Sequence, residues 1–191
     1  MIVLKDITKR FGRKTVIDGF SISLENGSRT ALVSPSGSGK TTLFRIIAGL
    51  EKRFDGERRV DGKIALMFQE DRLFEKVTVL DNVTAASDRD PEIAVRLLSD
   101  LGLSDALEAY PPALSGGMKR RVALARALFF DGDVVLLDEC FTGLDDGTKR
   151  TVASVINREI ENKTLVLISH DIEDAELLGC TPMILKNGFI K

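Results

Sequence analysis

Hydrophobic positions along the chain alternate between short continuous runs and longer segments with helical spacing. β-Branched and apolar residues dominate the short runs, and turn residues separate them, so these runs predict strands. The predicted strands lie at residues 2–4, 20–24, 30–33, 64–68, 134–137 and 164–168. The predicted helices lie at residues 41–50, 91–98, 118–130 and 146–161. Strands that alternate with helices in this order predict an α/β fold with a mostly parallel sheet.

The order of these elements also predicts how the chain is organised. The first sixty residues contain mainly strand patterns, and a small strand pair is expected around Lys186, Asn187 and Gly188. The intervening segment from about 71 to 124 is different, because helical spacing dominates it and proline breaks interrupt it. We therefore expect a single domain with a core of about residues 1–70 and 125–191. A helical subdomain of about residues 71–124 is inserted into that core.

Composition narrows the class of protein. The chain has 191 residues, of which 43% are hydrophobic and 29% are charged, a balance typical of one soluble globular domain. The formal net charge of −2 argues against a protein that binds nucleic acid with its whole surface. The basic run Lys119-Arg120-Arg121 is short, and such runs usually form a solvated helix face.

Cysteine and histidine are scarce. Cys140 and Cys180 are too few for a disulfide framework and suit a reducing compartment. With one histidine in the chain, a structural zinc site is not expected. Charged residues follow the first four residues at once, and no apolar run approaches the roughly 20 residues of a membrane span. We therefore expect a cytosolic protein that reaches a membrane only through a partner.

The first segment with recognisable chemistry is Ser34-Pro35-Ser36-Gly37-Ser38-Gly39-Lys40-Thr41, which follows a predicted strand and opens a predicted helix. It fits the phosphate-binding pattern G-x-x-x-x-G-K-[ST] in the context that this pattern requires. Backbone N–H groups of small residues can cradle an anion, and the helix N-terminus adds partial positive charge. Lys40 would neutralise the β- and γ-phosphates, and the Thr41 hydroxyl would ligate Mg²⁺.

This segment departs from the pattern at one position, because Ser34 stands where the first glycine is usual. Serine fits there at little cost if the backbone has negative φ, whereas positive φ would strain it. The remaining seven positions match the pattern. The alternative is a plain Gly/Ser turn beside an unrelated lysine, and the strand–loop–helix context argues against it.

A pair of acids, Asp138 and Glu139, ends the most apolar predicted strand. In open parallel sheets, ligands bind at the carboxyl ends of the strands. With a phosphate-binding loop in the same chain, Asp138 would hold the Mg²⁺ shell, through water, and Glu139 would polarise the attacking water as general base. An acidic strand end that merely faces solvent is the alternative.

A second candidate anion site is Leu114-Ser115-Gly116-Gly117-Met118, just before the helix predicted at 118–130. Serine and glycine at a helix N-terminus leave backbone N–H groups free to bind an anion. Because the first loop already serves one nucleotide, a second site is meaningful if it faces the nucleotide of another subunit.

At this point the sequence resembles the ABC ATPase family. Residues 114–118 resemble its signature LSGGQ, with Met118 where glutamine is usual. Asp138-Glu139 follows about 24 residues later, and Ser169-His170-Asp171 about 31 residues after that. The resemblance covers nearly the whole chain. It implies a P-loop NTPase core with a mostly parallel sheet, an N-terminal antiparallel β portion and a helical insertion subdomain.

The resemblance also implies roles for individual residues of this chain. Catalysis would involve Glu139, the switch histidine His170 and the Q-loop glutamine Gln69. Residues 142–145 resemble the D-loop, which crosses the dimer interface. The metal would be held by Thr41, Gln69 and Asp138. The nucleotide would contact Phe11, Ser34, Pro35, Ser36, Gly37, Ser38, Gly39, Lys40, Thr41, Thr42, Ser115, Gly116 and Gly117.

Among these residues, Phe11 would stack on adenine, although a core phenylalanine is the alternative. Cys140 stands where proline is common after the catalytic glutamate. Neither this change nor Met118 touches Lys40, Asp138, Glu139 or His170, so an active ATPase is expected.

The resemblance implies a head-to-tail dimer that sandwiches two ATP molecules with Mg²⁺. Each ATP would lie between one P-loop and the signature of the other subunit. We expect the motor of an importer at the inner face of the cell membrane, with polytopic permease subunits and an extracytoplasmic solute-binding protein and without nucleic acid. One alternative is a soluble ABC ATPase that acts on nucleic acid or the ribosome. Another is a small-molecule kinase, which has no use for residues 114–117.

Leu73 and Phe74 are apolar residues in an otherwise charged loop just after Gln69. Small apolar clusters with charged rims are typical of interfaces. We expect the membrane partner to dock a cytoplasmic helix here, between the core and the helical insertion. The alternative is that both side chains pack into the core.

Overall fold

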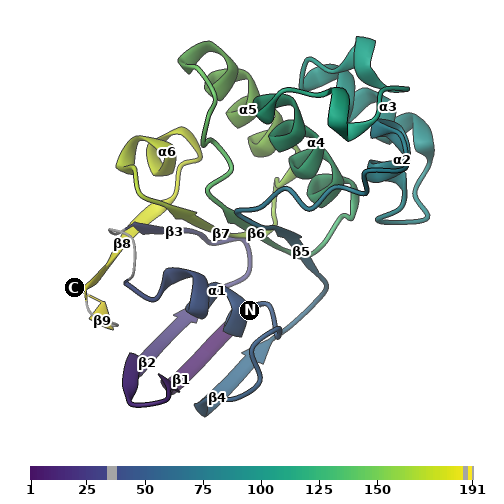
Figure 1. Cartoon of the computed structure of the whole chain (residues 1–191). Coiled ribbons are helices and arrows are strands. Elements are labelled where there is room, and N and C mark those ends of the chain that lie inside the picture. Colours follow the sequence, from purple (N-terminus) through teal and green to yellow (C-terminus); the bar gives the residue numbers. More distant parts are fainter. Residues whose placement is uncertain (34–37, 187–188, 191) are drawn as a thin grey trace.

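The computed structural model describes residues 1–33, 38–186 and 189–190. Its framework is a pair of sheets (Figure 1). The smaller sheet is antiparallel, with the order β2-β1-β4. Its strands are β1 (Ile2–Phe11), β2 (Lys14–Leu24) and β4 (Asp55–Val60). This sheet is the expected N-terminal antiparallel portion.

The larger sheet has the order β5-β6-β7-β3-β8-β9, and its first five strands are parallel. The short final strand pairs antiparallel with β8. The strands are β5 (Ile64–Met67), β6 (Val134–Asp138), β7 (Thr164–Ser169), β3 (Arg29–Val33), β8 (Thr181–Lys186) and β9 (Phe189–Ile190). The mostly parallel sheet confirms the predicted α/β fold.

The central strands β6 and β7 are buried along their whole length, which explains why their sequences are continuously apolar. Successive side chains point to opposite faces of a strand. Val135 and Leu137 therefore join the core under α2–α5, whereas Val134 and Leu136 join the core shared with α1 and the antiparallel sheet. Figure 1 shows these two layers on opposite sides of the larger sheet.

Most helices begin at a side chain that accepts a hydrogen bond from the first turn, as the capping rule expects. The caps are Thr78, Asp90, Ser115, Asp145 and Asp171, while Gly39 precedes α1. The helices are α1 (Lys40–Ile47), α2 (Val79–Thr84), α3 (Pro91–Asp100), α4 (Gly116–Phe129), α5 (Asp146–Glu159) and α6 (Ile172–Leu177). Two 3₁₀ turns cover Ser104–Ala106 and Pro111–Ala113.

The four predicted helices and six predicted strands are all present, but three further elements were not predicted. Two of them, α2 and α6, have six residues each, too few to give a helical period. The third, β4, reads Asp-Gly-Glu-Arg-Arg-Val and has no apolar alternation. In addition, α4 runs across the expected boundary between residues 124 and 125. The division into core and helical subdomain therefore stays a proposal.

The expectation for the basic run at residues 119–121 was wrong for its middle residue. Arg120 is 5% exposed, so it does not belong to a solvated face. It lies three and four residues before Ala123 and Leu124, which are both buried, and residues at that spacing share one helix face. Helix phase therefore turns this arginine inward.

Candidate nucleotide site

A cavity of about 280 Å³ lies where α1 begins and the parallel strands end, the position at which open parallel sheets bind ligands. Its volume is close to the lower limit for small-molecule pockets, about 300 Å³. The described lining consists of Lys14, Val16, Gly39, Lys40, Thr41, Thr42, Gln69, Glu139 and Ile168. This cavity therefore brings together six of the expected site residues from three separate segments, namely residues 39–42, Gln69 and Glu139.

Gly39 fixes the backbone at the start of α1. Its φ is 96°, in the left-handed region that favours glycine. A Cβ at this position would lie 3.0 Å from the carbonyl oxygen of Val16, closer than most real Cβ contacts. Residues 34–37, which include four of the expected nucleotide contacts, lie outside the described residues.

Lys40 is the first residue of α1 and is buried. Burial lowers the pKa of its ammonium group, whereas the nearby Glu139 and Asp138 carboxylates raise it. A buried cation at a helix N-terminus is an arrangement that attracts phosphate. Lys40 therefore lies where the sequence predicted a phosphate-binding charge.

Asp138 at the end of β6 is 3% exposed. Burial, and to a lesser extent repulsion from Glu139, raises the pKa of its carboxyl to about 6, against the attraction of Arg120 and Lys40. A divalent cation would favour the ionised carboxylate. In the described residues, no group of three or more His, Cys, Asp or Glu side chains converges on a metal position. The donors that fit Mg²⁺ are instead few and oxygen-based, namely the Thr41 hydroxyl, the Asp138 carboxylate and the amide oxygen of Gln69.

Glu139 is the centre of a polar cluster. Its Oε2 accepts hydrogen bonds from Gln69 Nε2 and Thr142 Oγ1, both at 3.4 Å. Its Oε1 lies 3.7 Å from His170 Nδ1. Glu139 has a φ of 52°, which is uncommon outside glycine. The structure thus brings together, from the ends of three neighbouring strands, the three residues to which the resemblance assigns catalysis, Gln69, Glu139 and His170, and it adds Thr142.

Phe11 lies at the end of β1 and is 52% exposed, so the alternative of a core phenylalanine was wrong. The Lys9 ammonium lies 4.6 Å from its ring centroid. Lys9 is itself buried and held by Glu51 at 3.0 Å and by the Arg53 carbonyl. Phe11 is not part of the cavity's described lining, but it pairs across the strands with Lys14, which is.

The N-terminus of α4 lies apart from this cavity. Ser115 caps it by accepting a hydrogen bond from the Met118 N–H at 3.2 Å, and Ser115 and Gly116 are exposed. A Cβ on Gly117 would lie 3.4 Å from the Leu144 side chain, so this turn packs on residues 142–145. The described lining of the cavity includes none of residues 115–117.

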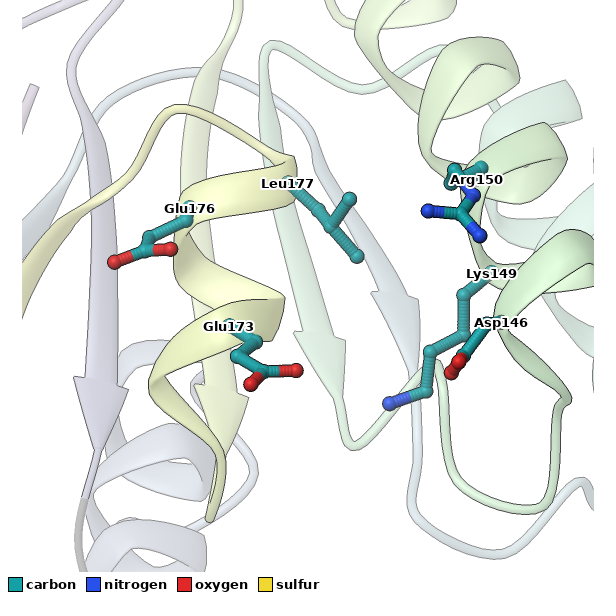
Figure 2. A pocket seen from close by; sticks show the side chains of 6 residues that line it. All are labelled: Asp146, Lys149, Arg150, Glu173, Glu176 and Leu177. Carbon is teal, nitrogen blue, oxygen red and sulfur yellow. The ribbon is translucent and has the colours of Figure 1, made fainter.

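A second cavity of about 460 Å³ lies between α5 and α6, and none of the expected site residues lines its described part. Figure 2 shows charged side chains facing it from both helices, with Lys149 extending from α5 toward α6. Lys149 Nζ lies 3.2 Å from Asp174, which accepts a hydrogen bond from Ser169 Oγ at 2.6 Å. This network supports the strand end that precedes His170.

The fold and the cavity define a class of protein, the P-loop nucleoside triphosphatases, in which a strand and a helix that begins with Lys-Thr lie at the same sheet edge as acids at the end of another parallel strand. The family model described as "ABC transporter" matches residues 17–142. The chain is 38% identical to "Aliphatic sulfonates import ATP-binding protein SsuB" of Delftia acidovorans, over 98% of this chain and 80% of that protein. The chain therefore belongs to the ABC transporter family of ATP-binding proteins.

Other relatives and solved structures agree. An SsuB protein of Corynebacterium glutamicum is 37% identical over 98% of this chain and 81% of its own length. A dimeric bacterial ABC transporter cassette, MJ0796, superimposes with a TM-score of 0.91 at 27% identity, covering 100% of this chain and 97% of that one. A post-hydrolysis state of the same cassette bound to ADP and Pi gives 0.90 at 27% identity, with the same coverage.

Family membership confirms the predicted activity, because the chain is an ATP-binding and ATP-hydrolysing subunit of an ABC transporter. Neither alternative, an ABC ATPase for nucleic acid or a small-molecule kinase, is favoured by the comparisons. Among the helices that the structure describes, none has the length and apolar character needed to cross a membrane.

Proposed function

We propose that this subunit energises the uptake of a small solute by hydrolysing Mg²⁺–ATP in a closed dimer of ATPase subunits. The observation that carries the proposal is the meeting of Gln69, His170 and Thr142 around the Glu139 carboxylate, beside the buried Lys40. Relatives named for aliphatic sulfonate import support the direction of transport and make a small organic anion a candidate solute.

The polar residues in and around the cavity have separate tasks in this proposal. Lys40 and the N–H groups of α1 bind the β- and γ-phosphates, and Thr41, Asp138 and Gln69 would hold Mg²⁺ through oxygen atoms. Bound there, Mg²⁺ would neutralise phosphate charge. Glu139 accepts a proton from the attacking water as general base. Gln69 and His170, on either side of its carboxylate, keep that group directed at the water.

The proposed dimer completes this site across an interface. Ser115, Gly116 and Gly117 would contact the γ-phosphate held by the partner's P-loop. The exposure of Ser115 and Gly116 supports this arrangement, as does the absence of residues 115–117 from the described lining of the chain's own cavity. The dimeric cassettes with the same fold support it as well. Because ATP then contacts both subunits, its γ-phosphate would stabilise the closed state.

The membrane partner would dock in a cavity of about 340 Å³ next to Gln69, lined by Leu66, Phe68, Arg72, Phe74, Ala85, Ala86 and Arg126. Phe74 is 58% exposed, which contradicts the alternative that it packs in the core, whereas Leu73 is partly buried against the core. We propose a polytopic permease as this partner and an extracytoplasmic solute-binding protein in the complete system. The ATPase would then lie at the cytoplasmic face of the membrane.

Replacing Phe74 by Asp tests the docking surface. Basal ATPase activity and melting temperature should stay near wild type, because the side chain is exposed, while assembly with the permease and coupled transport should be lost. Tyr110→Asp is the matched control, since Tyr110 is also exposed (51%) but does not line this cavity. Normal transport by Phe74→Asp would remove this surface from the proposal.

Glu139→Gln tests the catalytic assignment. The amide keeps the shape of the side chain but cannot accept the proton, so the hydrolysis rate should fall roughly 100- to 10,000-fold while ATP binding persists. The variant should also accumulate as an ATP-bound dimer on a sizing column. A normal turnover rate would rule out Glu139 as the base, and a monomer at saturating ATP would contradict the sandwich.

A further inference from the structure

Arg120 is a buried arginine that links two strand ends of the catalytic cavity. Its Nη2 donates to the carbonyl oxygens of Asp138 at 3.0 Å and Glu139 at 2.5 Å, and its Nε donates to Glu139 at 3.2 Å. One guanidinium therefore holds the backbone at the end of β6, directly at the two acids of the site.

The same guanidinium also reaches the end of β5. Its Nη1 donates to the carbonyl oxygens of Phe68, at 3.3 Å, and Gln69, and it pairs with the Asp71 carboxylate at 2.9 Å. The rigid planar fork of an arginine can serve several acceptors in fixed directions, which the single ammonium of lysine cannot do. The segment that carries Gln69 is thereby fixed against the segment that carries Glu139.

The backbone at Glu139 needs such support. A left-handed φ of 52° is unfavourable in a residue with a Cβ, so the surroundings must stabilise it. The Glu139 N–H donates to the Ile168 carbonyl at 2.9 Å, and Arg120 holds the Glu139 carbonyl. If that peptide rotated, the Glu139 side chain would turn away from Gln69 and His170.

Arg120 also connects the backbone at Glu139 to the first turn of α4, which follows Ser115 of the signature. It lies four residues after Gly116, where α4 begins, which corresponds to about 6 Å along the helix axis. The helix that offers its N-terminus to the partner's nucleotide is thus attached, within its first two turns, to the chain's own catalytic strand ends.

We propose that Arg120 is a positioning residue for ATP hydrolysis. It holds the Glu139 and Gln69 backbones in the relative position in which their side chains meet. This inference rests on the proposed role of Glu139 as the base. Arg120 itself contacts carbonyl groups and Asp71, so it acts on the reaction only through these neighbours.

The test compares Arg120→Gln and Arg120→Lys with Arg58→Gln. Arg58 is a matched control because it is partly buried and, among the described residues, donates to backbone carbonyls, those of Ile46 and Ile47 at the far end of α1. For each purified full-length variant, kcat, KM for ATP and the melting temperature are measured.

Arg120→Gln should lower kcat at least about tenfold and leave KM for ATP within about twofold, because the phosphate-binding residues stay in place. Arg120→Lys should recover part of kcat, since it keeps the charge and some donors. Arg58→Gln should lower the melting temperature by a similar amount without lowering kcat. In the Glu139→Gln background, Arg120→Gln should still form the ATP-bound dimer.

Wild-type kcat in Arg120→Gln would overturn the inference. A parallel loss of kcat and ATP affinity, unrelieved in Arg120→Lys, would also overturn it and assign Arg120 to general stability. Loss of the ATP-bound dimer only when Arg120→Gln is added to Glu139→Gln would overturn it in favour of a role at the signature. By contrast, normal turnover by Glu139→Gln alone would refute the proposed base, a result distinct from any Arg120 outcome.

Discussion

Two helices of this protein, α1 and α4, both begin directly after small residues, and yet their surroundings differ. At α1, the buried Lys40 lies in the first turn, and Gln69 and Glu139 line the same cavity. At α4, Ser115 and Gly116 are exposed, and a Cβ on Gly116 would meet nothing within 4 Å among the described atoms.

The difference teaches which half of a nucleotide site each helix can provide. The first turn of α1 is accompanied by a cation and by two acids, so it can bind phosphate, accommodate a metal and activate water. The first turn of α4 contributes a helix dipole and backbone donors. In the proposed dimer, it would add to a phosphate that is already held by the partner, which is what a trans contact requires. Variants at each helix should therefore fail in different assays.

Lys40→Ala should have the largest effect, because it removes the cation of the α1 site. A charge-assisted hydrogen bond is worth about 3 kcal/mol at most, so Mg²⁺–ATP should bind roughly a hundredfold more weakly. Equilibrium binding of a fluorescent ATP analogue to the isolated subunit measures this. Wild-type affinity would show that α1 is not the primary phosphate site.

Ser115→Arg should leave ATP binding by the monomer intact and block ATP-driven dimerisation, because the long side chain fills the space in front of α4. Sizing chromatography in the Glu139→Gln background reads out the dimer. Ser115→Ala is the control, since it loses the cap, at a cost of about 1 kcal/mol, but leaves that space open. Weak ATP binding by the Ser115→Arg monomer would place α4 in the cis site instead.

Mixing Lys40→Ala with Ser115→Arg sharpens the comparison. A mixed dimer has one composite site with both lesions and one with neither. Two inactive variants should therefore regain part of the ATPase activity when combined. If either variant alone were fully active, or if mixing restored nothing although mixed dimers form, the division of the site between two chains would be wrong.

Asp138→Asn should reveal the cost of keeping acids beside α1. Burial raises the Asp138 pKa from 3.8 to about 6, so the folded protein without metal binds the proton more tightly than the unfolded chain. The stability that protonation provides is complete below about pH 4 and lost as the pH rises through about 6. Asparagine carries no such penalty, and the variant should be more stable at pH 7.5, by up to about 3 kcal/mol.

Urea unfolding of metal-free protein at pH 7.5 and pH 4.5 measures this gain, which should shrink at the lower pH. Ser115→Ala is the comparison, because a lost helix cap at α4 should cost the same at both values. If the gain in stability of Asp138→Asn did not depend on pH, burial would not be raising the pKa of the Asp138 carboxyl.

Sequence patterns predicted the parts of this molecule whose causes are local. The strand before residue 34, Gly39 and Lys40 follow one another along the chain, and the apolar run of β6 ends in its two acids. Such patterns determine helix starts, strand burial and the residues at strand ends. The roles of Gln69 and His170 beside Glu139 came only from the resemblance to the ABC ATPase family, because neither residue stands in a local pattern of its own.

The parts that were not predicted depend on contacts between distant segments. Strand β4 is polar and pairs with β1 through its backbone, and a Cβ on Gly56 would lie 2.5 Å from the Lys5 carbonyl oxygen. Arg120 belongs to a basic run that resembles a solvated face. Its acceptors at Phe68 and Glu139 lie 52 and 19 residues away, so only the folded chain shows why this arginine is buried.

The smallest effect is expected at Phe11, which lies outside the cavity of α1. Phe11 is 52% exposed as a residue, and the Lys9 ammonium lies 4.6 Å from its ring centroid. If the exposed ring stacks on adenine, Phe11→Ala should lose about 1 kcal/mol, or roughly fivefold in ATP affinity. Calorimetric titration with Mg²⁺–ATP measures this loss.

Inorganic triphosphate is the probe that separates the contribution of adenine from that of the phosphates. It presents the same phosphates to α1 but carries no adenine. Its affinity should be the same for wild type and Phe11→Ala, and Phe11→Tyr should bind ATP like wild type, since it keeps an aromatic ring. Equal losses of affinity for ATP and for triphosphate would mean that Phe11 supports the phosphate-binding loop and does not contact adenine. An unchanged ATP affinity in Phe11→Ala would show that Phe11 is not part of the nucleotide site.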